Sequence, residues 1–122
     1  MTEIMIVEDN PRARRALKAL ISQQAGIVIT AEASNGQEAI RNIEKKIPDI
    51  VLMDMRMPIM DGLEATKIIK KNWSHIKIII LTMYPDCQTE ALSAGADAFL
   101  AKGCSMEEIT SSFHALSQCN CH

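Results

Sequence analysis

The sequence predicts an α/β fold, in which a doubly wound, five-stranded parallel sheet is covered by helices on both faces. Apolar runs of strand length alternate along the chain with segments whose apolar residues recur every three or four positions. The apolar runs are nearly continuous, which is typical of strands buried on both faces. Repeated strand–helix units of this kind form parallel βαβ layers.

Strands are expected over residues 3–7, 27–33, 50–53, 76–81 and 96–101, and helices over 11–25, 39–47, 63–71, 86–94 and beyond 105. Asn10 is expected to cap the first helix, which begins with Pro11. Pro48 ends the second helix. Ser105 and Glu108 have capping-box spacing at the last one. The apolar sides of the first two helices are expected to be Ala13, Ala16, Leu17, Leu20 and Ile21, and Ala39, Ile40, Ile43 and Ile47.

The length of 122 residues predicts a single domain spanning 1–122. The formal net charge is −2, and Lys and Arg occur in short clusters that resemble solvated helix faces: Arg12, Arg14 and Arg15; Lys45 and Lys46; Lys70 and Lys71. The sequence shows no basic face, and nothing in its charge pattern indicates that this segment itself binds nucleic acid. No run reaches membrane-spanning length, and no signal-peptide pattern opens the chain. We expect no membrane association and a cytoplasmic location.

Four cysteines are present, and free thiols are the expectation in a reducing cytosol. Cys119, Cys121 and His122 bring soft ligands together at the end of the chain. A frayed terminus provides no fixed coordination geometry, so an ordinary tail is favoured over a metal site.

Polar residues of a few chemical types follow the predicted strands. Glu8 and Asp9 end the first strand, Asp54 the third, Thr82 the fourth and Lys102 the fifth. The carboxyl ends of parallel strands meet at one edge of the sheet, where ligands bind. Asp54 by itself could equally cap the following helix, but its convergence with the other four favours a functional site.

Each of these residue types has a use at such an edge. Three close carboxylates repel one another unless a cation lies among them, and oxygen ligands with room for water suit Mg²⁺. A lysine and a hydroxyl opposite the cation would bind an anion, and a phosphoryl group bridges all three. Asp54 would then be the nucleophile that carries an aspartyl phosphate.

These residues stand in a pattern that resembles the response-regulator receiver domain of bacterial two-component signalling, especially receivers of the NarL/LuxR type. The matching stretches are Ile6-Val7-Glu8-Asp9-Asn10, Leu52-Met53-Asp54-Met55-Arg56-Met57-Pro58-Ile59-Met60-Asp61-Gly62, Ile80-Leu81-Thr82 and Ala94-Gly95-Ala96-Asp97-Ala98-Phe99-Leu100-Ala101-Lys102. The resemblance covers essentially the whole chain. It implies the flavodoxin-like (βα)5 receiver fold with strand order 2-1-3-4-5.

The resemblance also implies roles at the acidic end of the site. Asp54 would accept a phosphoryl group from a sensor histidine kinase. Asp9 and Asp54 would bind Mg²⁺ directly, together with the backbone carbonyl of Arg56, and Glu8 would act through water. The protein would be a signalling phosphoacceptor that labels itself from phosphodonors and dephosphorylates itself, and not an enzyme acting on other substrates.

The remaining implied roles concern switching. Thr82 and Lys102 would contact the phosphoryl oxygens, and Phe99 occupies the position of the switch aromatic. Phosphorylation would draw Thr82 inward, let Phe99 rotate and change the surface around the fourth helix and the last strand. A homodimer could form on phosphorylation, through the outward sides of the first and last helices or through the fourth-helix face.

Two positions depart from common receivers. Gly103 follows Lys102, where many receivers have a proline with a cis bond, so that local geometry is open. Arg56 and Tyr84 occupy the positions that tune autodephosphorylation. Both are bulky, and we expect a slowly decaying phosphoryl form; the alternative is that both are solvent-facing side chains with little effect.

Receivers of this type control a DNA-binding output domain. No such domain follows within this sequence, so the output is expected either in a trimmed part of a longer transcriptional regulator or, in a free-standing receiver, in protein partners or a phosphorelay. A dehalogenase-type phosphatase would need a second acid at Arg56, and a nucleotide binder would need a glycine-rich loop where Glu8-Asp9-Asn10-Pro11 stands. A degenerate, phosphorylation-independent receiver is not motivated, because every required residue type is in place.

Overall fold

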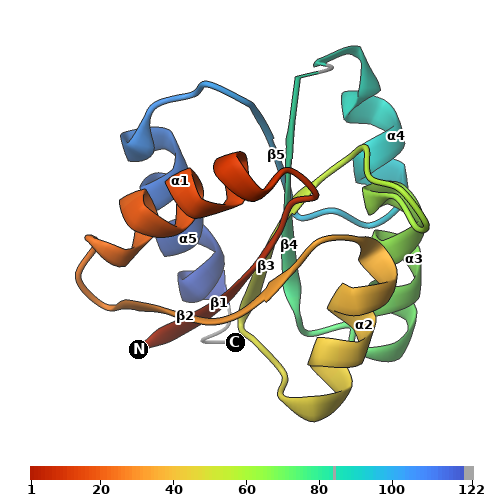
Figure 1. Ribbon diagram of the computed structural model, residues 1–122, viewed down its shortest axis with the longest axis horizontal. Helices are drawn as coiled ribbons and strands as arrows, with labels where there is room; N and C mark the ends of the chain where they lie inside the picture. Colours follow the sequence, from red (N-terminus) through yellow and green to blue (C-terminus); the bar gives the residue numbers. More distant parts are fainter. Residues whose placement is uncertain (84, 120–122) are drawn as a thin grey trace.

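The computed structural model describes residues 1–83 and 85–119, and its centre is a five-stranded parallel sheet in the order β2-β1-β3-β4-β5 (Figure 1). The strands are β1 (Thr2–Val7), β2 (Ile27–Ala33), β3 (Ile50–Asp54), β4 (Lys77–Thr82) and β5 (Ala98–Ala101). The helices are α1 (Pro11–Ser22), α2 (Gly36–Lys45), α3 (Gly62–Asn72), α4 (Gln88–Ser93) and α5 (Met106–Cys119), with a 3₁₀ turn, η1, over Pro85–Cys87. The predicted fold and strand order are confirmed.

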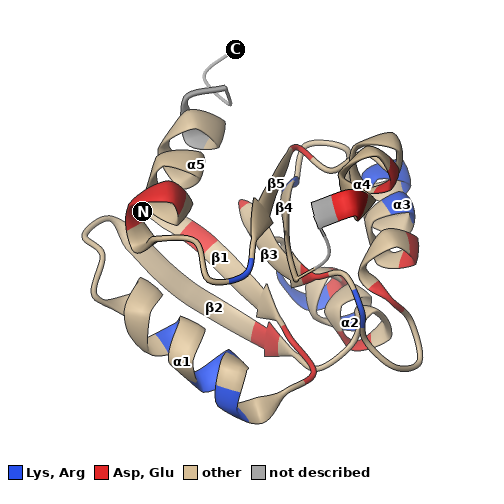
Figure 2. Cartoon of the chain, turned by 90° about the horizontal axis from the view of Figure 1, so that it is seen from above, with Lys and Arg blue, Asp and Glu red and all other residues tan. Residues whose placement is uncertain are grey.

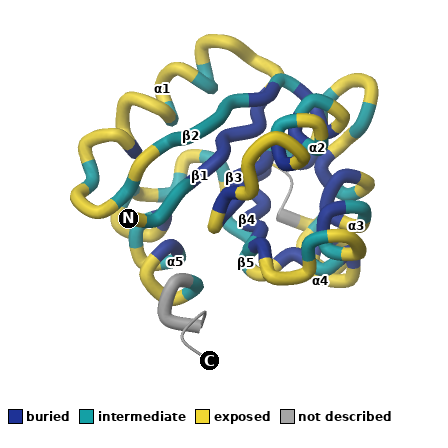
Figure 3. The backbone as a smooth tube through the Cα atoms, turned by 90° about the horizontal axis from the view of Figure 1, so that it is seen from below, coloured by how far each residue is buried: buried dark blue, intermediate teal, exposed yellow. Residues whose placement is uncertain are grey.

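Helices cover both faces of the sheet, with α1 and α5 on one side and α2, α3 and α4 on the other (Figure 1). Each face has its own apolar core. The α1/α5 core includes Ile6, Leu52, Ile109 and Phe113, whereas the other core is built around Val51, Ile78 and Ile69. The three central strands are buried, and β2 is partly open along the edge (Figure 3). Burial on both faces explains why the strand sequences are nearly continuous in apolar residues.

The helix starts follow from local side-chain chemistry. Asn10, Asn35 and Asp61 each accept a hydrogen bond from a backbone N–H of the helix that they precede, and Ser105 does so at α5. Such caps satisfy donors that the first helical turn leaves without a partner. Because Asp61 caps α3, Asp54 is not needed as its cap.

Several predicted boundaries were wrong. α2 ends at Lys45, and Ile47 is 45% exposed instead of lining the core. The reason is Pro48, which disfavours helical backbone at the residue before it. Leu20 is 48% exposed, because only Leu17 and Ile21 of its helix reach the core. The fourth helix begins as the η1 turn, and the last strand is shorter than predicted.

Within the described part of the chain, no helix combines the length and the apolar character that crossing a membrane requires.

Candidate functional site

The polar residues that follow the strands meet at the carboxyl edge of the sheet, as predicted. Val7 pairs with Met53, which brings the residues after β1 beside Asp54. Asp54 pairs with Leu81, and Thr82 pairs with Ala101. The strand register therefore brings Glu8, Asp9, Asp54, Thr82 and Lys102 to one edge from four strands.

Three carboxylates form a cluster at this edge. One oxygen from each of Glu8, Asp9 and Asp54 lies within 4.8 Å of the others. Their exposure differs: Glu8 is buried, the Asp54 side chain is 11% exposed, and Asp9 faces solvent. Oxygen ligands at this spacing, open to water on one side, fit a hard divalent cation.

Lys102 is the cation that faces these acids. Its Nζ lies 2.7 Å from Oε1 of Glu8 and 3.2 Å from Oδ2 of Asp54. Burial by itself would lower the pKa of Lys102, but the hydrogen bonds and charges of Glu8 and Asp54 outweigh it and raise this pKa above its ordinary 10.5. A raised lysine pKa means that the ion pairs are fully formed at neutral pH and weaken only in strong alkali.

The backbone also fixes Lys102. Its N–H donates to the carbonyl of Thr82 at 2.7 Å, and Thr82 is fully buried beside it. Gly103 follows at φ +90°, a left-handed conformation that favours glycine. No peptide bond between described residues is cis, which settles the geometry that the missing proline left open.

Burial raises the pKa of Asp9 above its ordinary 3.8, and the hydrogen bond with Glu8 and the charge of Glu8 act in the same direction. A carboxyl group whose pKa is raised on folding destabilises the folded state when it is ionised. Ionised Asp9 is therefore unfavourable in the folded state, first because of its desolvation and then because of the neighbouring Glu8 carboxylate.

We predict that Asp9→Asn raises the unfolding temperature of the metal-free protein at pH 7. The advantage should shrink as the pH falls through the raised pKa of Asp9, because protonation then removes the same charge. Mg²⁺ at a hundredfold its Kd should stabilise the parent by about 2.7 kcal/mol and the variant far less. Thermal unfolding in EDTA and in Mg²⁺ measures both effects. Glu44→Gln, an exposed acid of α2, is the control, and equal behaviour of the two variants would contradict the prediction.

The loop after Asp54 folds back against its own strand. Gly62 donates from its backbone N–H to the carbonyl of Met55 at 2.8 Å, and Gly36 donates to the carbonyl of Met60 at 2.9 Å. Ile59, 77% exposed at the tip, has a φ of +70°, which is strained for a β-branched residue. The loop is thus tied by backbone hydrogen bonds to the end of β3 and to the start of α2.

Two further predicted residues lie at or near this edge. The Arg56 side chain is exposed. Phe99 is half-buried on the face covered by α2, α3 and α4, where it packs against the core that includes Ala91 of α4. Tyr84 lies outside the described residues, as do Cys121 and His122. Cys87 and Cys104 have free thiols, as expected.

The prediction that the basic clusters are solvated helix faces was wrong for two residues. The Arg14 side chain is 23% exposed, and its Nη1 donates to the carbonyl of Glu8 at 2.8 Å. Lys70 is 17% exposed and pairs with Asp97 at 2.7 Å. Arg14 contacts the residue that follows β1, and Lys70 contacts the residue that precedes β5. Neither partner lies on the same helix, so the spacing of residues within a helix does not predict these contacts.

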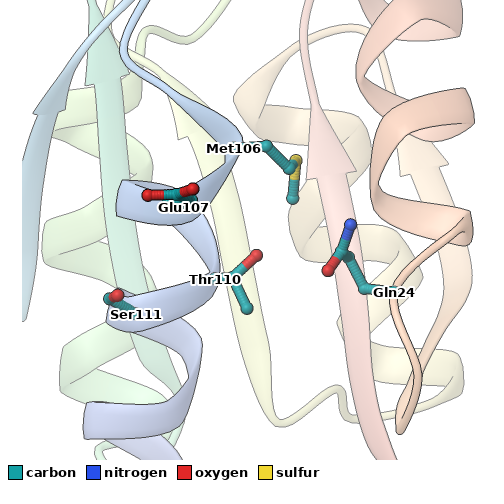
Figure 4. A pocket seen from close by; sticks show the side chains of 5 residues that line it. All are labelled: Gln24, Met106, Glu107, Thr110 and Ser111. Atoms are coloured by element: carbon teal, nitrogen blue, oxygen red, sulfur yellow. The ribbon is translucent and has the colours of Figure 1, made fainter.

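A larger cavity lies away from this site. About 450 Å³ lies between the end of α1 and the start of α5, lined by Gln24, Met106, Glu107, Thr110 and Ser111 (Figure 4). By contrast, the small space that Glu8, Asp54 and Lys102 help to line has no room for a water molecule. It is therefore not a pocket for an organic ligand.

Comparison with known proteins agrees with this geometry. A family model described as the response regulator receiver domain matches residues 4–114. The transcriptional regulatory protein LnrK of Bacillus subtilis is 38% identical over 111 residues, which are 89% of this chain and 50% of LnrK. The chain thus spans about half the length of the curated relatives that it matches.

Solved structures show the same fold. A two-component response regulator of the LuxR family from Aurantimonas has a TM-score of 0.90 at 33% identity, over 97% of this chain and 87% of that one. The response regulator TrrA of Thermotoga maritima, solved in complex with Mg²⁺-BeF, has a TM-score of 0.86 at 32% identity, over 95% of this chain and 99% of that one. The chain belongs to the response regulator receiver domain family.

Proposed function

We propose that this chain is a phosphorylation-dependent signalling switch, in which Asp54 accepts a phosphoryl group from a sensor histidine kinase in the presence of Mg²⁺. The observation that carries the proposal is the meeting of three carboxylates within 4.8 Å with the single ammonium of Lys102, 3.2 Å from Asp54. The family membership and the Mg²⁺-BeF complex of the relative TrrA support it.

The charges of the cluster support a divalent cation. Glu8, Asp9 and Asp54 carry three negative charges when ionised, and Lys102 supplies one positive charge. Two negative charges remain, and at separations of a few ångströms they repel both each other and an incoming phosphate. Asp9 and Asp54 would bind the ion directly with the backbone carbonyl of Arg56, and Glu8 through water. When bound, Mg²⁺ would neutralise charge on the acids and on the phosphoryl oxygens.

In the proposed step, a carboxylate oxygen of Asp54 attacks the phosphorus of a phosphohistidine. The new P–O bond forms as the P–N bond breaks, and the departing imidazole takes up a proton. Lys102 would move from Glu8 and Asp54 toward the phosphoryl oxygens, and Thr82 would donate its hydroxyl to them. Labelling from acetyl phosphate would be the same attack by Asp54, with acetate as the leaving group. In autodephosphorylation, water would attack the phosphorus, the bond from phosphorus to Asp54 would break, and inorganic phosphate and the free carboxylate would result.

The proposed output is a change of surface. Inward movement of Thr82 would make room for Phe99, which is half-buried on the α4 side. To convert a mostly inactive population into a mostly active one, the phosphoryl group must favour the active state by roughly 5 kcal/mol. That the bulky Arg56 and Tyr84 slow the loss of the phosphoryl group stays a prediction.

The test is intact mass after incubation with acetyl phosphate and Mg²⁺. The parent should gain one phosphoryl group and Asp54→Asn none, because the amide is no nucleophile at phosphorus. Asp61→Asn is a matched control, since it makes the same change at a nearby cap where asparagine serves equally well. Labelling of Asp54→Asn, or no labelling of the parent where a known receiver is labelled, would overturn the proposal.

We further propose that the output is transcriptional, through a DNA-binding domain in the longer regulator. Support comes from LnrK, a transcriptional regulatory protein, and from a structural relative described as a DNA-binding response regulator of the LuxR family from Staphylococcus aureus. The alternative is a free-standing receiver that acts through protein partners or a phosphorelay. The length of the encoded protein distinguishes the two. A homodimer on phosphorylation belongs to the same proposal.

A further inference from the structure

Arg14 connects α1 to the segment that carries the acidic residues. From the end of the first turn of α1, its Nη1 donates to the backbone carbonyl of Glu8 at 2.8 Å, while its Nε lies 3.5 Å from Oε1 of Glu32 on β2. Glu32 in turn pairs with Lys18 at 2.9 Å. Figure 2 shows the basic stretch of α1 beside the acidic ends of β1 and β2. The rigid fork of the guanidinium allows both contacts at once.

Each polar group of Glu8 has a hydrogen-bond partner. Its Oε1 accepts from Lys102 at 2.7 Å, its Oε2 from the backbone N–H of Asn10 at 3.2 Å, and its backbone N–H donates to Ala33 at 3.0 Å. The carbonyl held by Arg14 is the one that joins Glu8 to Asp9. The peptide unit before Asp9 is therefore anchored, and with it the backbone from which the exposed Asp9 side chain extends.

We propose that Arg14 is a positioning residue for the cation site: by binding the carbonyl of Glu8 it holds the Asp9 carboxylate within reach of Glu8 and Asp54. The proposal rests on the Mg²⁺ site of the proposed function. It assigns Arg14 no contact with the ion or with the phosphoryl group. Removing a residue that orients a metal ligand without contacting the metal typically weakens metal binding 10- to 100-fold.

The direction in which the Mg²⁺ affinity changes distinguishes a positioning role of Arg14 from a simple effect of its charge. Arg14 is a cation close to three carboxylates, so removing its charge alone would strengthen the binding of a divalent cation. Removing its hold on the Glu8 carbonyl would weaken binding, because Asp9 would have to be ordered at the moment when the ion binds. Positioning predicts weaker Mg²⁺ binding in spite of the more favourable charge.

The experiment compares Arg14→Met with Lys18→Met. Both variants remove one positive charge that pairs with Glu32, but Arg14 also binds the carbonyl of Glu8. Mg²⁺ affinity is measured by calorimetry, and the rate of labelling by acetyl phosphate is measured across Mg²⁺ concentrations. Arg14→Met should bind Mg²⁺ about tenfold more weakly than the parent. Its labelling rate at saturating Mg²⁺ should equal that of the parent, and Lys18→Met should bind Mg²⁺ like the parent or slightly more tightly.

The outcomes distinguish the two proposals. If the parent binds Mg²⁺ and is labelled, but Arg14→Met binds the ion as tightly as the parent or more tightly, the role of Arg14 is overturned and the proposed function stands. If both variants weaken binding equally, loss of the Glu32 pairs is the cause, and positioning through Glu8 is wrong. If the parent shows no Mg²⁺ response and no labelling, the proposed function fails and the positioning role fails with it. Hydrogen exchange at the Asn10 amide, faster in metal-free Arg14→Met only, is the supporting structural readout.

Discussion

Replacing Phe113 by alanine should lower the free energy of unfolding by about 3–5 kcal/mol, the range for removing a buried aromatic ring. Phe113 is 2% exposed and belongs to the core between α5 and the sheet, together with Ile4, Ile6 and Leu52. The ring is one of the side chains by which α5 packs on that face, together with Ile109, and an alanine there leaves a cavity that a sheet strand cannot fill. Urea unfolding of the parent and the variant measures the loss.

The same substitution should leave the chemistry of Asp54 intact while the protein is folded. Phe113 lies in the core of the α1/α5 face, whereas the acids and Lys102 lie at the carboxyl edge of the strands. Phe113→Leu, which keeps most of the apolar volume, is the matched control and should cost clearly less. A loss below about 1 kcal/mol for Phe113→Ala would mean that α5 is not anchored by this ring.

Replacing Gly62 by alanine should both destabilise the protein and slow the labelling of Asp54. A Cβ at this position would lie 2.3 Å from the backbone oxygen of Asp54 and 2.9 Å from Cα of Met55. Both are backbone atoms, so the loop or the end of β3 must move. Overpacking of this kind costs about 1–3 kcal/mol, and more where the backbone is rigid. The displaced segment is the one that presents the Asp54 carboxylate and the carbonyl of Arg56.

Gly26→Ala is the control for Gly62→Ala. Gly26 has a φ of +82° and no atom within 4 Å of an added Cβ, so its substitution adds backbone strain without displacing the site. The two variants should lose comparable stability, about 1–2 kcal/mol for the control, but only Gly62→Ala should be labelled more slowly by acetyl phosphate at saturating Mg²⁺. Equal labelling rates would show that the contact relaxes within α3 and not at Asp54.

Much of the fold was predictable because its signals are local. Caps such as Asn10 and Ser105 act on N–H groups two or three residues away, and apolar runs reveal strands buried on both faces. The errors occurred where tertiary packing decides which side of a helix is buried. Leu20 continues the apolar spacing of α1 but is 48% exposed, and Ile47 is excluded from α2 by the proline that follows.

The sequence by itself determined which chemical groups follow each strand, and the carboxyl ends of parallel strands must share one edge. That was enough to bring Glu8, Asp9, Asp54, Thr82 and Lys102 together. Only the tertiary structure decided how they are paired: Lys102 lies closer to Glu8 than to Asp54, and Arg14 reaches back to the carbonyl of Glu8. A long, flexible basic side chain can reach several partners. Strand register and burial decide which of them it contacts, and neither can be predicted from the spacing of residues along the chain.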